Sequence, residues 1–155
     1  MPIRQAAVVL TAVVGLCGCT GDADRAPRTA ATASSPSGSC ATPPSAADGG
    51  IDVAATGGQV YAIVFAPRLP VRSGAQLKVV WRVTGRGDLH VTSRRPDGSA
   101  GRLSFGPEPH TGSSFARPGD EWGTGFVLDA PGCWELEVQR GDVVGRLPLE
   151  VLPAG

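Results

Sequence analysis

From residue 51 onward, apolar and polar residues alternate with a period of two, and this pattern constrains the fold more than any other feature of the chain. The segment "QLKVVWRVT" (76–84) and the segment "WELEVQ" (134–139) each place one face of apolar side chains against one polar face. Further predicted strands are "IDVAA", "VYAIVFA" with Tyr61, Ile63 and Phe65 facing inward, "DLHVTS", "RLSF", "TGFVLD" and "GRLPLEV".

Clusters of Gly, Pro and Asp separate these segments and supply the turns between them. Two of the turns contain Arg-Gly-Asp, at residues 86–88 and 140–142; the Gly and Asp suit a tight turn, and we favour that role over cell adhesion. No window after residue 50 has a helical period free of Gly and Pro. The sequence therefore predicts an all-β domain over residues 51–155, an antiparallel β-sandwich of seven or eight strands.

The first 18 residues have the pattern of an export signal. Arg4 precedes an uncharged stretch of apolar and small residues from Ala6 to Gly18. This stretch is shorter than the roughly 20 residues that a membrane-spanning helix needs. We therefore interpret residues 1–18 as a signal peptide.

The segment Leu16-Cys17-Gly18-Cys19 resembles the lipobox of bacterial lipoproteins. In that family an aliphatic residue stands three positions before the modified cysteine and a small residue directly before it, as Leu16 and Gly18 do for Cys19. The resemblance implies that Cys17 leaves with the leader and that Cys19 carries fatty acyl chains such as palmitate. It also implies that the protein is held at the outer face of the cytoplasmic membrane, where several acyl chains make attachment lasting. The alternative is a secreted protein cut at another position.

Residues 19–50 differ sharply in composition from the rest of the mature chain. Between Thr20 and Gly50 there is no Leu, Ile, Val, Phe, Tyr or Trp. Such a segment cannot bury enough apolar surface to offset the entropy of ordering, so we predict a disordered tether.

Cys40 and Cys133 are the cysteines that remain after Cys17 and Cys19. An exported chain enters an oxidising compartment, which favours a Cys40–Cys133 disulfide over two free thiols. Because Cys133 directly precedes an inward-facing Trp134, the bond should lie on the outside or rim of the domain.

The segment around Trp81 and the later segment Pro131-Gly132-Cys133-Trp134 resemble a group of uncharacterised small bacterial lipoproteins and secreted proteins. The likeness spans roughly residues 59 to 151. It implies an immunoglobulin-like sandwich. The chain departs from true immunoglobulin domains because Cys40 lies far upstream of Trp81, within the predicted tether.

The charges and the histidines exclude several kinds of function. Without the leader the chain has thirteen basic and fourteen acidic residues, a net charge near −1 that predicts no affinity for nucleic acid or for a charged membrane surface. His90 is expected to face solvent, and His110 is expected in a Pro-rich loop. With two histidines and no catalytic frame around any serine, we predict no metal, no cofactor and no catalytic residues.

The segment 106–125 is the best candidate for function, because we expect it to be a loop longer than compact domains usually contain. Phe115, Arg117 and Trp122 within it are of the types that dominate binding hot spots. The alternative is that Phe115 and Trp122 fold back and cap one end of the domain.

These features predict a monomeric, lipid-anchored, non-enzymatic binding module that recognises a protein or glycan of the cell envelope. The alternative is an extracytoplasmic hydrolase or protease inhibitor that works through the 106–125 loop and, for a hydrolase, through His110.

Overall fold

The computed structural model describes residues 40–155, which form strands and loops only. All but one of the strand pairs are antiparallel, so the prediction of an all-β antiparallel fold is confirmed. The strands are β1 (Ile51–Thr56), β2 (Val60–Phe65), β3 (Val71–Arg72), β4 (Ala75–Val83), β5 (His90–Arg94), β6 (Arg102–His110), β7 (Asp120–Leu128), β8 (Gly132–Arg140) and β9 (Val143–Leu152). No helix in this part of the chain is long and apolar enough to cross a membrane.

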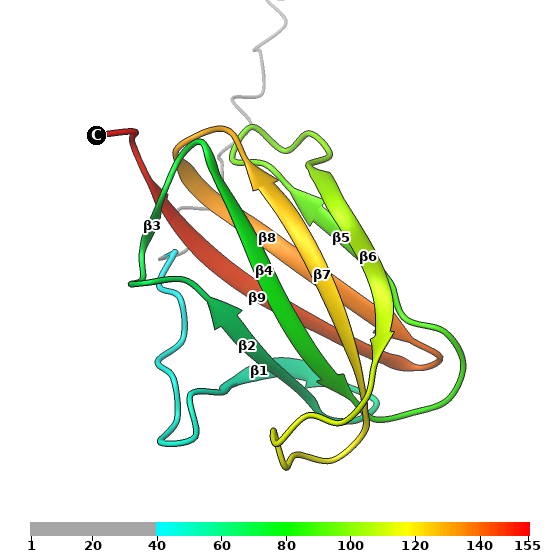
Figure 1. Ribbon diagram of the computed structural model, residues 1–155. Helices are drawn as coiled ribbons and strands as arrows, with labels where there is room; N and C mark the ends of the chain where they lie inside the picture. The colour runs from blue at the N-terminus through cyan, green and yellow to red at the C-terminus, as the bar shows by residue number, and fades with distance from the viewer. Residues whose placement is uncertain (1–39) are drawn as a thin grey trace, which may run out of the picture. The chain divides into compact units, whose positions relative to one another are not determined.

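A single path of hydrogen-bonded strands runs β5-β8-β9-β1-β2-β4-β7-β6, and the short β3 pairs in parallel with β9. Strand β1 joins the two halves of this path because its register is split. Ile51–Val53 pair with β2, whereas Ala54–Thr56 pair with β9. In Figure 1, β2, β4, β7 and β6 form the near layer, β9, β8 and β5 form the far layer, and β1 connects the layers at the base.

The other edges of the two layers also approach each other. Arg94 and Ala100 form an isolated bridge between β5 and the segment before β6, and the Gly101 amide donates to the carbonyl of Ser93 at 2.8 Å. The sheet is therefore nearly barrel-shaped, and the predicted β-sandwich is not confirmed.

The barrel interior is filled by the faces that the alternating pattern predicts for β4 and β8. Trp81, Phe126 and Trp134 are fully buried there. Both of these tryptophans donate a hydrogen bond from the indole nitrogen: Trp81 to the hydroxyl of Thr124 at 2.8 Å, and Trp134 to the carbonyl of Ala130 at 2.9 Å. His90 is exposed, as expected.

The prediction that Tyr61, Ile63 and Phe65 of β2 face inward is wrong. Val60 and Ala62 are buried in the barrel, whereas Tyr61 and Ile63 are partly exposed and Phe65 is 54% exposed. Because β2 is apolar on both faces, alternation alone does not specify its orientation. Pairing with β4 decides it, since Ala62 lies opposite Trp81.

The predicted Cys40–Cys133 disulfide is confirmed, with a Cα–Cα distance of 5.4 Å. Cys133 lies on the outer side of β8, so the bond attaches the N-terminal segment to the outside of the barrel. Residues 40–50, expected in the tether, have no strand or helix but contact the domain. The hydroxyl of Thr42 accepts from the amide of Glu150, and the guanidinium of Arg117 binds Asp48. The signal peptide (1–18), Cys19 and the tether up to residue 39 lie outside the described residues.

The prediction that residues 106–125 form one long loop is wrong. β6 continues to His110 and β7 begins at Asp120, so the loop consists of Thr111–Gly119 only. Gly106, Pro107 and Pro109 suggest a loop in the sequence, but they lie on an edge strand with register shifts, where a proline needs no partner on its open side.

Candidate binding site on the outer face of the sheet

Five polar or aromatic residues from five neighbouring strands lie in one row across the near layer. The strand registers pair Asp52 with Tyr61, Tyr61 with Arg82, Arg82 with Glu121, and Glu121 with His110. Asp52, Tyr61 and Arg82 alternate with buried residues along their strands, and directly paired residues share one face of a sheet, so the row lies on the outer face. We call it the polar row.

Glu121 is the centre of the polar row, and its side chain is 2% exposed. One carboxylate oxygen accepts from Nε of Arg82 at 3.1 Å, and the other binds Nδ1 of His110. Where Glu121 is ionised it can only accept, and the proton of this bond then belongs to Nδ1. Nε2 of His110, on a side chain that is 44% exposed, is left for a ligand.

Arg82 connects the polar row to the β6–β7 loop. Its guanidinium donates to the carbonyl of Arg117 at 3.2 Å and to that of Gly119 at 3.0 Å, besides Glu121. With these bonds the loop is held over the row.

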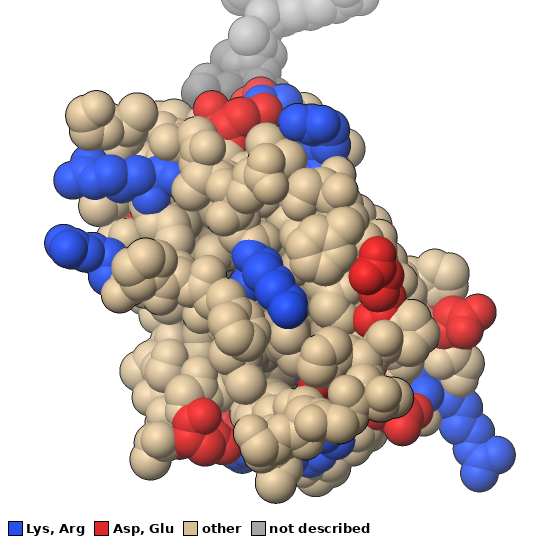
Figure 2. All heavy atoms as spheres, viewed as in Figure 1, with Lys and Arg blue, Asp and Glu red and all other residues tan. Residues whose placement is uncertain are grey.

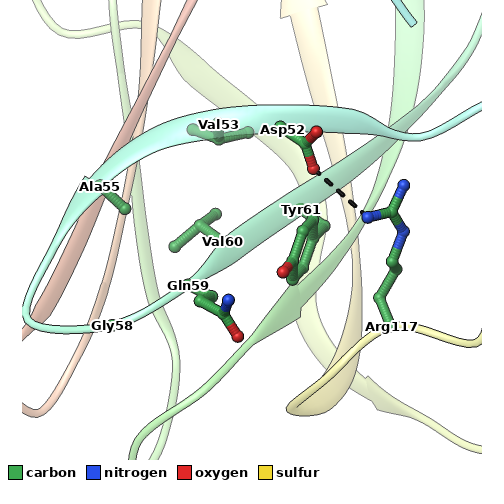
Figure 3. A pocket seen from close by; sticks show the side chains of 8 residues that line it. All are labelled: Asp52, Val53, Ala55, Gly58, Gln59, Val60, Tyr61 and Arg117. Carbon is green, nitrogen blue, oxygen red and sulfur yellow. Dashed lines mark hydrogen bonds and ion pairs between the residues drawn. The ribbon is translucent and has the colours of Figure 1, made fainter. Parts of the chain in front are cut away.

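Arg117 reaches back from the loop to the other end of the row (Figure 3). Its guanidinium lies 4.9 Å from the centre of the Tyr61 ring, and it binds Asp48 at 2.7 Å and Asp52 at 3.5 Å. The hydrogen bond from Arg117 holds the pKa of the Asp48 carboxyl below its ordinary value, and the same bond raises the pKa of Arg117. Arg117 thereby links the loop to β1, β2 and the segment before β1.

Phe115 and Trp122 have little exposed surface. Phe115 is 6% exposed and covers Gly50, where an added Cβ would lie 2.8 Å from its ring. Trp122 is 7% exposed and points into the barrel beside Arg140. Of the three residues predicted to bind a partner, the structure brings only Arg117 to the polar row. The capping arrangement expected as the alternative matches the positions of the other two.

Two open hollows lie against the row. One, of about 380 Å³, is lined by Asp52, Gln59, Tyr61 and Arg117 (Figure 3). The other, of about 530 Å³, is lined by Asp88, Thr111 and the His110 end of the row. Each hollow combines charged groups with a ring that carries a polar atom, the hydroxyl of Tyr61 in the first and Nε2 of His110 in the second. Both hollows therefore suit a polar ligand better than an apolar one.

Arg140 closes the barrel beside the second hollow. Its guanidinium donates to the carbonyls of Gly87 and Val83 at 2.8 and 2.9 Å and binds Asp120. The Arg-Gly-Asp at 140–142 therefore has no free cation, whereas Arg86 and Asp88 of the other triplet are exposed.

Comparison with protein-family models, with curated proteins and with solved structures finds no match to the chain. The function must therefore be inferred from the site itself. Within residues 40–155, no three His, Cys, Asp or Glu side chains are placed to hold a metal ion. In the same range, no serine, threonine or cysteine side chain hydrogen-bonds His110.

Tyr61, Arg82 and Glu121 were not predicted as site residues. The signal that could have identified Glu121 is an acidic residue at the start of an otherwise apolar strand. The pairing of β6, β7 and β4 places it between His110 and Arg82. The sequence carries no direct trace of that pairing.

Proposed function

We propose that this protein is a lipid-anchored binding module of the bacterial cell envelope, which recognises an envelope protein or a glycan through the polar row and its two hollows. Cys19 is the attachment point, and the domain stands at the outer face of the cytoplasmic membrane. The immunoglobulin-like sandwich that the resemblance implies stays part of this proposal, with β1 shared between its sheets.

The compartment is supported by the Cys40–Cys133 disulfide, because such bonds persist in oxidising environments. The lipobox-like segment supports the anchor. The two features agree, since a lipoprotein leader would deliver the domain to a compartment in which this disulfide forms.

The single observation that carries the binding role is the polar row itself. Its charged groups are already paired, with one another or, for Asp52, with Arg117, so donors and acceptors are held in fixed positions before a ligand arrives. Such preorganisation lowers the entropic cost of binding. Tyr61, beneath the guanidinium of Arg117, offers an aromatic edge and a hydroxyl that suit a sugar or a polar peptide segment.

The His110–Glu121 pair favours a second candidate, a hydrolase in which His110 activates water. A carboxylate that orients a histidine is the arrangement a general base needs. We rank this candidate second because, within residues 40–155, no serine, threonine or cysteine side chain hydrogen-bonds His110, so it relies on water alone as the nucleophile. Turnover of p-nitrophenyl esters or phosphates that is lost in His110→Gln would establish the hydrolase instead.

The binding role can be tested with a photo-crosslinking amino acid placed at exposed positions in living cells. Gln59 and Thr111 line the two hollows, and exposed Thr92 on β5 serves as the control. We expect one common adduct from Gln59 and Thr111, its loss in Tyr61→Ala, and no such adduct from Thr92. Identical adducts from all three positions would contradict a site on the polar row.

The anchor can be tested separately by metabolic labelling with an alkyne fatty acid. The wild-type chain should be labelled, and Cys19→Ser should lose the label and leave the membrane fraction after a high-salt wash. An unlabelled wild-type chain, or an amino terminus at another residue, would contradict the anchor while leaving the binding site untouched.

A further inference from the structure

The net charge of the whole chain predicts no affinity for a charged membrane surface, but the two ends of the barrel have opposite charge, which the net charge does not reveal. The disulfide end consists of segments 66–74, 94–102, 128–133 and 150–155, which the strand pairings bring together around Cys133. The loop end consists of segments 48–52, 82–89, 108–121 and 140–143. The segments of the disulfide end contain five arginines and three acidic residues, a net charge of +2. The segments of the loop end contain four arginines and seven acidic residues, a net charge of −3.

Most arginines of the disulfide end have no acidic partner among residues 40–155, and we call these the free arginines. Arg95 binds Asp129 at 2.5 Å. No carboxylate of residues 40–155 lies within salt-bridge distance of the other four, which are all exposed: Arg68, Arg72, Arg94 and Arg102. At the loop end Arg82, Arg117 and Arg140 are all paired with carboxylates. The unpaired positive charge is therefore concentrated at the disulfide end. Figure 2 shows basic side chains at the upper left, the top and the centre of this face, with others at the bottom and lower right, and acidic ones at the top, the right and the lower left.

The described chain also begins at the disulfide end. Cys40 is bonded to Cys133, and Thr42 is hydrogen-bonded to Glu150 near the end of β9. Whatever precedes residue 40 is thus joined to the domain beside the free arginines. Phe65, 54% exposed at the end of β2, adds an aromatic ring next to the segment that carries Arg68, with the ammonium of Lys78 5.2 Å from the ring centre.

From the free arginines and the entry point of the chain we propose that the disulfide end docks on an anionic lipid surface, so that the polar row at the loop end is turned away from the membrane. The proposal extends the lipid-anchored function above and rests on it for the direction of the anchor. An arginine near an anionic leaflet raises partitioning onto it about fivefold. Such weak contacts are enough for a tethered domain, whose effective concentration at the surface is already high.

Vesicle sedimentation tests the docking without the anchor, using the mature chain from residue 19 with Cys19→Ser. Vesicles contain either phosphatidylcholine alone or equal parts of phosphatidylcholine and phosphatidylglycerol. We expect binding to the anionic vesicles only, weakening as salt is raised.

Two double variants with the same change in net charge locate the contact. R68Q/R102Q removes charge from the disulfide end and should lower partitioning about tenfold or more, by the contribution of two arginines. R86Q/R146Q removes the same amount of charge, once from the loop end and once from β9. It should change the partitioning onto anionic vesicles less than about twofold. Circular dichroism confirms that both variants are folded.

Equal losses in both variants, equal binding to both kinds of vesicle, or no binding to anionic vesicles would each overturn the docking. None of these results bears on the attachment at Cys19, because the tested chain carries no lipid. A wild-type protein that takes up no fatty-acid label would overturn the lipid attachment at Cys19 without affecting the vesicle result.

Discussion

The guanidinium of Arg140 lies over the indole of Trp122, 4.4 Å from the ring centre, and seals one end of the barrel. Arg140 is 7% exposed, and its donors bind two main-chain carbonyls and Asp120. An arginine is suited to this position because its planar fork can stack on the ring and serve several acceptors at once. The β4–β5 turn and the β8–β9 turn are held together by this one side chain.

Replacing Arg140 with methionine should destabilise the domain by about 2–4 kcal/mol, because the buried carbonyl of Val83 and the part-buried carbonyl of Gly87 lose their donor and the cation–aromatic contact is lost. Urea unfolding followed by tryptophan fluorescence measures the change. Arg146→Gln is the control: Arg146 is 59% exposed and binds Glu137 at the surface, so its loss should cost about 1 kcal/mol or less. Equal costs for the two variants would contradict the structural role of Arg140.

Removing the disulfide by Cys40→Ser with Cys133→Ser should lower the unfolding free energy by about 2–5 kcal/mol, since the bond constrains a long loop of the unfolded chain. The sequence separation of the two cysteines is 93 residues. Thermal unfolding of wild type with and without reductant should reproduce the difference, whereas the double variant should not respond to reductant. A wild-type protein whose untreated thiols react with an alkylating reagent would show that the bond is not formed.

The elements that could be predicted from the sequence are those in which one face alone is apolar. β4 and β8 meet this condition, and Trp81 and Trp134 lie inside the barrel as expected. Strand β2 is apolar on both faces, so its orientation depends on pairing with β4, which local pattern does not encode. Likewise, the prolines of β6 indicate a loop in the sequence. They are compatible with a strand only because β6 lies at the edge of the sheet.

The polar row shows the same limit for function. Asp52, Tyr61, Arg82, Glu121 and His110 come from five strands, and their proximity follows from four strand registers at once. Sequence reasoning could identify Arg117 by residue type, but its neighbours are set by long-range pairing. Residues that each look like ordinary surface positions therefore form the candidate site.

Two glycines with positive φ provide a matched test of backbone packing between turns. An added Cβ at Gly57 would lie 2.2 Å from the carbonyl oxygen of Asp142, whereas at Gly74 nothing lies within 4 Å. Gly74→Ala should cost about 1 kcal/mol from backbone strain alone. Gly57→Ala should cost at least about 2 kcal/mol more, because main-chain atoms of the β8–β9 turn must move. Urea midpoints that are equal for the two variants would contradict the close approach.

The link between Arg117 and Asp48 predicts how the stability of the loop contact depends on pH. The pKa of Asp48 is lowered from its ordinary value of 3.8, chiefly by the hydrogen bond from Arg117 and then by the amide of Gly50. A carboxyl with a depressed pKa in the folded state stabilises that state above its unfolded pKa, and the contribution is lost as the pH falls through the folded value.

In Arg117→Gln, the carboxyl resonance of Asp48 should titrate at higher pH than in wild type. The stability difference between the two proteins should be constant near neutrality and shrink below about pH 4. Asp97, whose pKa is lowered by Ser99 rather than by Arg117, provides an internal reference that should not move. An unchanged titration of Asp48 in the variant would show that Arg117 does not hold the loop to this segment in solution.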